Sequence, residues 1–238
     1  LGIVADCKLV LENLCHEQVL TSSHEEWNDY CINNKSNYPF KYDENDKNFC
    51  KPQKAIEYIG KVTNGNAIVT TDVGQHQMWT AQFYPFKNYG QWVTSGGLGT
   101  MGFGIPSAIG AQLAEPEKTV VCFVGDGGFQ MTNQEMALLP EYGLNVKIVL
   151  INNGTLGMVK QWQDKFFNKR FSHSVFNDQP DFMKMAEAYG IKVFLIDSPD
   201  KLESSIDEAF AYHGPALIEV RISPIEPVNP MVPSGKSN

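Results

Sequence analysis

The chain has 238 residues, of which 42% are hydrophobic, and this is enough for one large domain with its own core. The formal net charge is −8 and Lys and Arg do not cluster, which argues against a nucleic-acid partner. No apolar run approaches the roughly 20 residues that span a bilayer, and residues 1–6 lack the basic start of a signal peptide. The five cysteines form no CxxC motif, so we expect free thiols in a cytoplasmic protein.

The first fifty residues differ from the rest because they are rich in Asn, Lys, Glu and Asp. We expect a short strand at 1–5 and a helix near 7–15. Linker and irregular structure is expected to follow over 17–51.

From residue 52 onward, apolar runs alternate with amphipathic stretches. The predicted strands are Ala67–Thr71, Thr119–Val124, Val146–Ile151, Val193–Ile196 and Ala216–Ile222. The predicted helices are Gln53–Val62, His76–Phe83, Pro106–Ala114, Asn133–Glu141, Pro180–Tyr189 and Pro199–Tyr212. Near-continuous apolar strands separated by helices predict an α/β fold, with a parallel sheet covered by helices on both faces. Ligands of such folds bind beyond the carboxyl ends of the strands.

A glycine-rich turn follows the predicted strand at 119–124. Gly125-Asp126-Gly127-Gly128-Phe129 leads into a helix, whose start offers free N–H groups to an anion. The carboxylate of Asp126 would repel a phosphate unless a cation lies between them, so the pattern favours a phosphate together with a hard metal ion. An ordinary strand-to-helix turn is the alternative interpretation of these five residues.

The next predicted strand ends in Asn152-Asn153-Gly154-Thr155, and twenty-four residues separate Gly127 from Asn152. One helix and one strand return the chain to the same edge of a parallel sheet, so Asn153 is expected to reach the metal that Asp126 binds. Diphosphate oxygens, a water and a backbone carbonyl near Thr155 would complete an octahedron suited to Mg²⁺.

The pairing of Gly-Asp-Gly with Asn-Asn at this spacing resembles the signature of thiamine-diphosphate enzymes. Three further stretches, 72–79, 94–102 and 156–163, narrow the resemblance to acetohydroxyacid (acetolactate) synthases, although Asp72 stands where that family often has Glu. The similarity runs from about residue 52 to Pro233. It implies that 1–16 is a remnant of the central domain, 17–51 a linker or irregular segment, and 52–238 the thiamine-diphosphate domain with a C-terminal tail. From 228 onward, we expect this tail to be mobile.

The resemblance also implies a set of site residues. Gln75 and His76 would contact the diphosphate, the Gly99 carbonyl the 4′-amino group, and Met101 the bent cofactor. The Mg²⁺ ligands would be Asp126, Asn153 and Thr155. The substrate approach would be lined by Val159 and Trp162, the latter linked to choice of the second 2-ketoacid. The complete implied cofactor-binding set is Val73, Gln75, His76, Gly99, Met101, Gly125, Asp126, Gly127, Gly128, Asn153, Thr155, Leu156, Gly157 and Met158.

The implied activity is decarboxylation of pyruvate and condensation with a second 2-ketoacid, in branched-chain amino-acid biosynthesis. In the family, the glutamate that activates the cofactor comes from an N-terminal domain of a neighbouring subunit, and FAD contacts mainly regions outside 1–238. We therefore expect this stretch alone to be inactive. A homodimer or homotetramer and a regulatory subunit are further expectations from the resemblance, with no nucleic-acid or membrane partner.

Two alternatives stay open at this point. One is another thiamine enzyme, such as a pyruvate oxidase or decarboxylase. The other is a nicotinamide-binding domain, because Gly97–Gly102 fits the pattern G-x-G-x-x-G. The acidic residue expected about twenty positions further on would be near Glu117, which precedes a predicted strand instead of ending one.

Overall fold

The structure is a computed structural model, and it describes residues 2–17, 23–44, 46–232 and 235. The chain forms two compact units, Leu1–Lys41 and Tyr42–Asn238. Residues 233, 234 and 236–238 of the tail that we expected to be mobile lie outside the described residues.

The first unit contains two helices, α1 (Cys7–His16) and α2 (Glu25–Asn37), neither of which has a buried residue. The carboxylate of Asp6 begins α1 by accepting hydrogen bonds from two backbone N–H groups. The predicted strand at 1–5 is wrong: residues 2–5 are exposed and form no strand, because no described strand pairs with them. The predicted irregular segment 17–51 also needs correction, because it contains α2. That helix lacks a clear apolar stripe and begins with two acidic residues, which suit a helix N-terminus.

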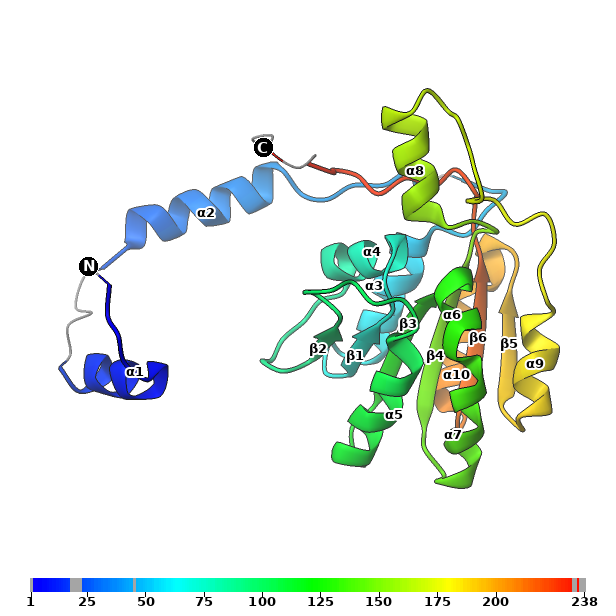
Figure 1. The fold of residues 1–238 in the computed structure, drawn as a ribbon, viewed down its shortest axis with the longest axis horizontal. Helices are drawn as coiled ribbons and strands as arrows, with labels where there is room; N and C mark the ends of the chain where they lie inside the picture. Colours follow the sequence, from blue (N-terminus) through cyan, green and yellow to red (C-terminus); the bar gives the residue numbers. More distant parts are fainter. Residues whose placement is uncertain (1, 18–22, 45, 233–234, 236–238) are drawn as a thin grey trace. The chain divides into compact units, whose positions relative to one another are not determined.

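The second unit is built on one six-stranded sheet in which all neighbouring strands are parallel, in the order β2-β1-β3-β4-β6-β5 (Figure 1). The strands are β1 (Ile68–Thr71), β2 (Trp92–Thr94), β3 (Val120–Gly125), β4 (Val146–Asn152), β5 (Lys192–Ile196) and β6 (Ala216–Arg221). The helices are α3 (Pro52–Val62), α4 (Gln75–Phe83), α5 (Gly104–Ala114), α6 (Asp126–Thr132), η1 (Asn133–Ala137), α7 (Leu138–Glu141), α8 (Gly157–Phe166), α9 (Phe182–Ala188), η2 (Pro199–Lys201) and α10 (Leu202–Ala211).

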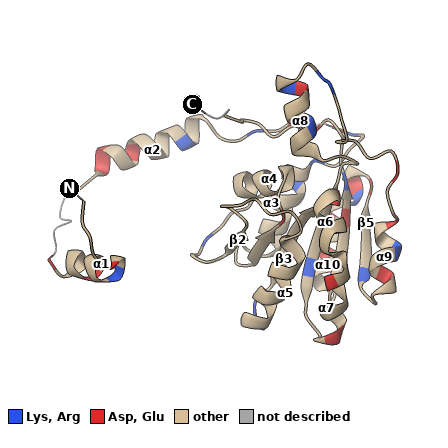
Figure 2. Cartoon of the chain, in the orientation of Figure 1, with Lys and Arg blue, Asp and Glu red and all other residues tan. Residues whose placement is uncertain are grey.

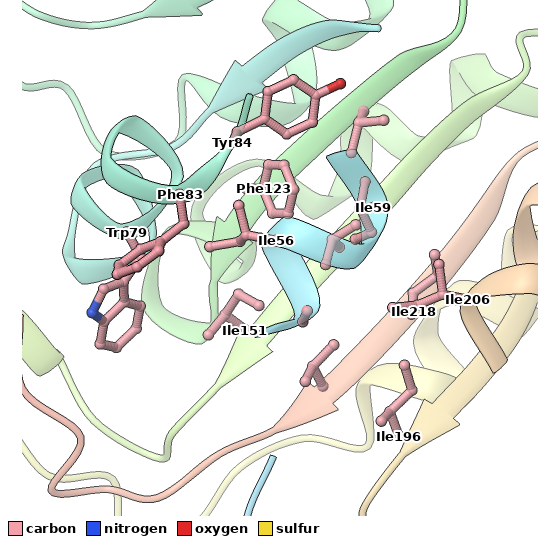
Figure 3. Packing of buried hydrophobic residues seen from close by; sticks show 14 of the residues in the cluster. Ile56, Ile59, Trp79, Phe83, Tyr84, Phe123, Ile151, Ile196, Ile206 and Ile218 are labelled. Atoms are coloured by element: carbon pink, nitrogen blue, oxygen red, sulfur yellow. The ribbon is translucent and has the colours of Figure 1, made fainter. Parts of the chain in front are cut away.

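Two hydrophobic cores lie on opposite faces of this sheet. On one face, α3, α4 and α10 contribute apolar side chains such as Ile56, Trp79 and Ile206 (Figure 3). On the other face, α5, α6 and α9 contribute a second cluster, in which the rings of Phe129 and Phe182 meet edge to face at 5.4 Å. The predicted α/β class, with a parallel sheet covered by helices on both faces, is confirmed.

The five predicted strands are all present, with ends that differ by at most one residue. The sequence did not predict β2, a three-residue edge strand, or α8 as a separate helix. The single helix predicted at 133–141 is instead the 3₁₀ helix η1 followed by α7, which contains Pro140.

The segment just before residue 52 and the start of the C-terminal tail are both packed within the second unit. Cys50 is buried and bridges to Ile222, so residues 42–51 join this unit ahead of the predicted boundary at 52. Val228 is fully buried, and its backbone N–H and carbonyl both hydrogen-bond the side chain of Gln161, at 2.9 and 3.0 Å. The expectation of a mobile tail is therefore wrong at its first residue.

Charges of both signs are interspersed on α8 and α9 (Figure 2). Among the described residues, no helix is long and apolar enough to cross a membrane.

Candidate functional site

The candidate site lies where three neighbouring strands end. In the sheet, β1 neighbours β3, and β3 neighbours β4, with Gly125 opposite Ile151. The chain leaves β1 toward α4 on one face and β3 toward α6 on the other, so the direction of winding reverses between these strands. Such a reversal opens a crevice at the carboxyl edge of the sheet, where ligands of this class of fold bind.

At the end of β1, the buried carboxylate of Asp72 holds the backbone in place. It accepts hydrogen bonds from the N–H groups of Val73 (2.9 Å), Gly102 (3.1 Å) and Gly104 (2.9 Å). It also lies against Gly128 so closely that a Cβ added there would overlap it. Asp72 thus ties together the ends of β1 and β3 and the loop that precedes α5.

His76, in the first turn of α4, is a buried and neutral side chain. Burial lowers its pKa to about 4, although the Asp72 carboxylate and a hydrogen bond to the Asp72 backbone favour the charged form. Its Nε2 has no hydrogen-bond partner among the described residues. A buried polar atom without a partner at a pocket wall is a candidate contact for a ligand.

Asp126 is the first residue of α6 and is only 2% exposed. Its Oδ1 accepts from the N–H of Gly127 at 2.9 Å, and its Oδ2 accepts from the side-chain amide of Gln179 at 2.8 Å. Burial raises the pKa of Asp126 to about 6, although these two donors and the backbone N–H groups of Gly154 and Thr155 favour the carboxylate. The turn after β3 and the turn after β4 therefore meet at this carboxylate.

The turn after β4 is fixed by the side chain of Asn153. Its Oδ1 accepts from the backbone N–H of Thr155 at 3.0 Å and from the Thr155 hydroxyl at 2.9 Å. Its Nδ2 donates to Gln75 Oε1 at 3.0 Å. Because an amide oxygen has two lone pairs, a metal ion at Asn153 has to replace one of the two Thr155 contacts.

Glycines let these elements approach one another. A Cβ at Gly125 would lie 2.8 Å from Nδ1 of His76, and a Cβ at Gly157 would overlap the side-chain amide of Gln75. These glycines are therefore required by close contacts between β3 and α4 and between α4 and α8.

The pocket at this edge gathers most of the residues named from the sequence. It is lined by Val73, Gly74, Gln75, His76, Trp79, Met101, Gly125, Asp126, Gly127, Gly128, Ile151, Asn153, Thr155, Leu156, Gly157, Met158 and Val159. Gly99 does not line it but lies beside Val73, with a φ of +64°. Trp162 lies outside the lining, half exposed on α8.

Gln179 is a site residue that the sequence did not suggest. It lies in the segment between α8 and α9, which folds back over the turn after β4. The N–H of Leu156 donates to the Ser174 carbonyl at 2.9 Å, and the N–H of Phe176 donates to the Gly154 carbonyl at 3.0 Å. Gln179 is thereby brought to Asp126, 53 residues away in the sequence. No local motif indicates such a contact.

The donor set suits a metal that is held jointly with a phosphate ligand. Among the described residues, no group of three or more His, Cys, Asp or Glu side chains is placed to hold a metal. Asp126, Asn153 and Thr155, which the resemblance implies as metal ligands, all line this pocket. Mg²⁺ binds to such sparse protein donors together with phosphate oxygens and water.

The glycine segment Gly97–Gly102 does lie between a strand, β2, and a helix, α5, as a dinucleotide-binding turn would. However, three of its N–H groups are already used within the protein. Those of Gly99 and Thr100 donate to the Ser95 carbonyl and hydroxyl, and that of Gly102 donates to the Asp72 carboxylate. A pyrophosphate at this turn would also lie near the buried carboxylate of Asp72.

Fold and site define a domain of the thiamine-diphosphate class, and comparison with known proteins agrees. Residues 72–220 match the family described as thiamine pyrophosphate enzyme, C-terminal TPP binding domain, and the chain belongs to this family. Thiamine pyrophosphate is another name for thiamine diphosphate.

Among named proteins, the chain is similar to acetolactate synthases. It is 51% identical to the acetolactate synthase large subunit of Lactococcus lactis over 233 residues, covering 98% of this chain and 40% of that protein. It is 42% identical to the acetolactate synthase isozyme 3 large subunit of Escherichia coli over 238 residues, covering 96% and 41%. It is 47% identical to the acetolactate synthase large subunit of Porphyra purpurea over 188 residues, covering 79% and 32%. The chain thus spans about two fifths or less of the length of these relatives.

Proposed function

We propose that this chain is the cofactor-binding part of a thiamine-diphosphate-dependent acetolactate synthase. The proposed reaction joins pyruvate, after loss of carbon dioxide, to a second 2-ketoacid in branched-chain amino-acid biosynthesis. The observation that carries the proposal is the meeting of Asp126 with the turn that bears Asn153 and Thr155, at the edge of a glycine-lined pocket. The shared name of the three relatives supports the choice of acetolactate synthase.

In the proposed complex, the side chains of Asp126 and Asn153 and the carbonyl of Thr155 hold Mg²⁺, which in turn holds the diphosphate. His76 contacts the diphosphate end as a neutral imidazole, because burial keeps its pKa near 4. When bound, thiamine diphosphate supplies the carbanion chemistry that a protein side chain cannot. The protein's part is to bind and orient the cofactor and to exclude water.

The substrate approach is proposed to run along α8, since Val159 lines the pocket and Trp162 follows on the same helix. Both side chains are about half exposed. We propose that Trp162 contacts the second 2-ketoacid, as the resemblance implies.

Asp126 is the only carboxylate among the residues that line the pocket in the described part of the chain. We propose that the acid that activates the cofactor comes from another part of the full-length enzyme, and that this stretch alone does not form acetolactate. Bound FAD, a homo-oligomer and a regulatory subunit are proposed for the full-length enzyme on the same resemblance. The designation of the relatives as large subunits supports a smaller partner.

Thermal unfolding with thiamine diphosphate and Mg²⁺, each alone, and NAD tests the proposal. A ligand at a hundred times its Kd adds about 2.7 kcal/mol of stability. At roughly 2–4 °C per kcal/mol for a chain of this size, Tm should rise by about 5–10 °C. A rise that needs both thiamine diphosphate and Mg²⁺ is expected, and a rise with NAD alone would contradict the proposal. Product analysis of the full-length enzyme separates a synthase from a pyruvate oxidase or decarboxylase.

A further inference from the structure

Glu219 is a buried carboxylate in the sheet, between β4 and the edge strand β5, and lies outside every motif discussed above. It belongs to β6 and is only 2% exposed. Its Oε1 accepts hydrogen bonds from Nδ2 of Asn152 at 2.9 Å and from Nε of Arg221 at 3.1 Å. A buried carboxylate destabilises the fold unless it is hydrogen-bonded, and these two donors stabilise Glu219 in the core.

Strand register explains why these three side chains meet. Leu150 of β4 is opposite Glu219, and Asn152 is opposite Arg221. Because side chains alternate along a strand, Asn152, Glu219 and Arg221 share one face of the sheet. On that face Leu150 and Leu217 belong to the apolar core, and Asn152 and Arg221 follow at the carboxyl ends of β4 and β6.

The contact with Glu219 determines which way the Asn152 amide points. Since Nδ2 donates to the carboxylate, Oδ1 is turned toward the next turn of the chain, where it accepts from the N–H of Gly154 at 3.1 Å. Gly154 has a φ of +67°, and it lies between Asn153 and Thr155, which carry the proposed metal donors. One carboxylate on β6 is thus linked through one amide to the backbone of the metal-binding turn.

We propose that Glu219 is a positioning residue for the metal-binding turn: through Asn152 it sets the backbone at Gly154 and so the placement of the Asn153 and Thr155 oxygens. For the identity of the metal, this inference rests on the function proposed above. Glu219 itself touches neither metal nor cofactor.

The two divalent ions Mg²⁺ and Ca²⁺ respond differently to a displaced turn. Mg²⁺ demands near-ideal octahedral geometry with short bonds, whereas Ca²⁺ accepts longer bonds and irregular geometry. Loss of a residue that orients metal ligands typically weakens metal affinity about 10–100-fold. Loss of the Glu219 contact should therefore weaken Mg²⁺ binding more than Ca²⁺ binding. A general loss of stability would not change the ratio between them.

Two variants separate positioning from packing. Glu219→Leu removes the acceptor but matches the neighbouring leucines at 150 and 217, so the fold should persist. Glu219→Gln keeps an oxygen that accepts from Asn152 and should restore the wild-type behaviour. Arg221→Gln is the control, because it removes the second donor and leaves the link from Glu219 to Asn152 intact.

The first measurement needs no ligand: amide hydrogen exchange of Gly154 by NMR in the full 238-residue chain. Glu219→Leu should speed exchange at Gly154 by about tenfold, in line with loss of one hydrogen bond. Exchange in β4 and β6 should stay unchanged, and Glu219→Gln and Arg221→Gln should behave like the wild type. Unchanged exchange at Gly154, or equal acceleration along both strands, overturns the proposal.

The second measurement titrates Mg²⁺ or Ca²⁺ into each variant with saturating thiamine diphosphate. Glu219→Leu should raise the Mg²⁺ concentration at half-saturation about tenfold and that of Ca²⁺ by less than about threefold. Equal losses for both ions, or no loss, overturn the proposal. If the wild type binds no thiamine diphosphate with either ion, the proposed function fails, and the exchange measurement still decides the role of Glu219.

Discussion

Replacing Asp126 by asparagine should stabilise the ligand-free chain while abolishing its response to Mg²⁺. At pH 7 the wild-type side chain is a charged carboxylate that is 2% exposed. Burial raises its pKa from 3.8 to about 6, which means that the fold favours the neutral form. Asparagine is neutral at every pH and nearly the same shape.

The size of the effect follows from the pKa shift. A shift of about two units corresponds to roughly 3 kcal/mol of destabilisation at pH 7. The hydrogen bonds from Gln179 and the backbone N–H groups are already contained in this net shift, because they lower the pKa against the effect of burial. The gain is therefore up to about 3 kcal/mol, which raises Tm by roughly 6–12 °C. Since the folded pKa lies above the unfolded one, the gain should be complete above pH 6 and vanish as pH falls to about 4.

Urea unfolding at pH 7 and pH 4 measures this gain, and thermal unfolding with thiamine diphosphate and Mg²⁺ measures the response to ligand. The exposed Asp178→Asn is the control, because it changes the net charge equally without touching the site. Lower stability of Asp126→Asn at pH 7 would refute the argument from burial. A retained Mg²⁺-dependent rise in Tm would refute the assignment of Asp126 as a metal ligand.

Three further changes test other parts of the structure. Gly128→Ala would push a Cβ into the Asp72 carboxylate and should cost about 1–3 kcal/mol in urea unfolding. Gly110→Ala, which faces open space in a helix, should instead gain up to about 1 kcal/mol. Equal effects of the two variants would contradict the close contact at Gly128. Lys147→Met would leave three part-buried acceptor oxygens without their ammonium donor. The variant should cost about 1–3 kcal/mol by the same assay, and unchanged stability would show that water replaces the ammonium group. The His76 ring should titrate by NMR near pH 4, and a midpoint near 6.5 would show that it is not buried.

Much of the fold is predictable from the sequence because its strands are buried on both faces. The runs that became β3, β4 and β6 are nearly uninterrupted apolar segments, and such runs leave little choice of structure. The edge strand β2 has three half-buried residues, too few for a pattern. The helix α2 lacks an apolar stripe, so periodicity gives no signal for it.

The residues of the candidate site also divide into predictable and unpredictable ones. Asp126 and Asn153 are predictable because one crossover between parallel neighbours fixes which strand ends meet. Gln179 and Glu219 are not predictable, because their contacts depend on the path of a loop and on the register between two strands. Gln179 and Glu219 contact Asp126 and Asn152 of the sequence motif but do not belong to the motif themselves. A one-residue slip in the register of β6 would turn Glu219 to the opposite face of the sheet.

Burial shifts the two titratable side chains of the pocket in opposite directions, and the consequences for stability oppose each other. The pKa of His76 falls to about 4, so its contribution to stability is lost as pH falls from about 6.5 to 4. The pKa of Asp126 rises to about 6, so its cost is relieved as pH falls from about 6 to 3.8. Between pH 6 and 4 the folded chain gains a proton at Asp126 while the unfolded chain gains one at His76, and the two effects nearly cancel. Asp126→Asn removes one side of this balance, so over that range the variant should lose stability more steeply than the wild type.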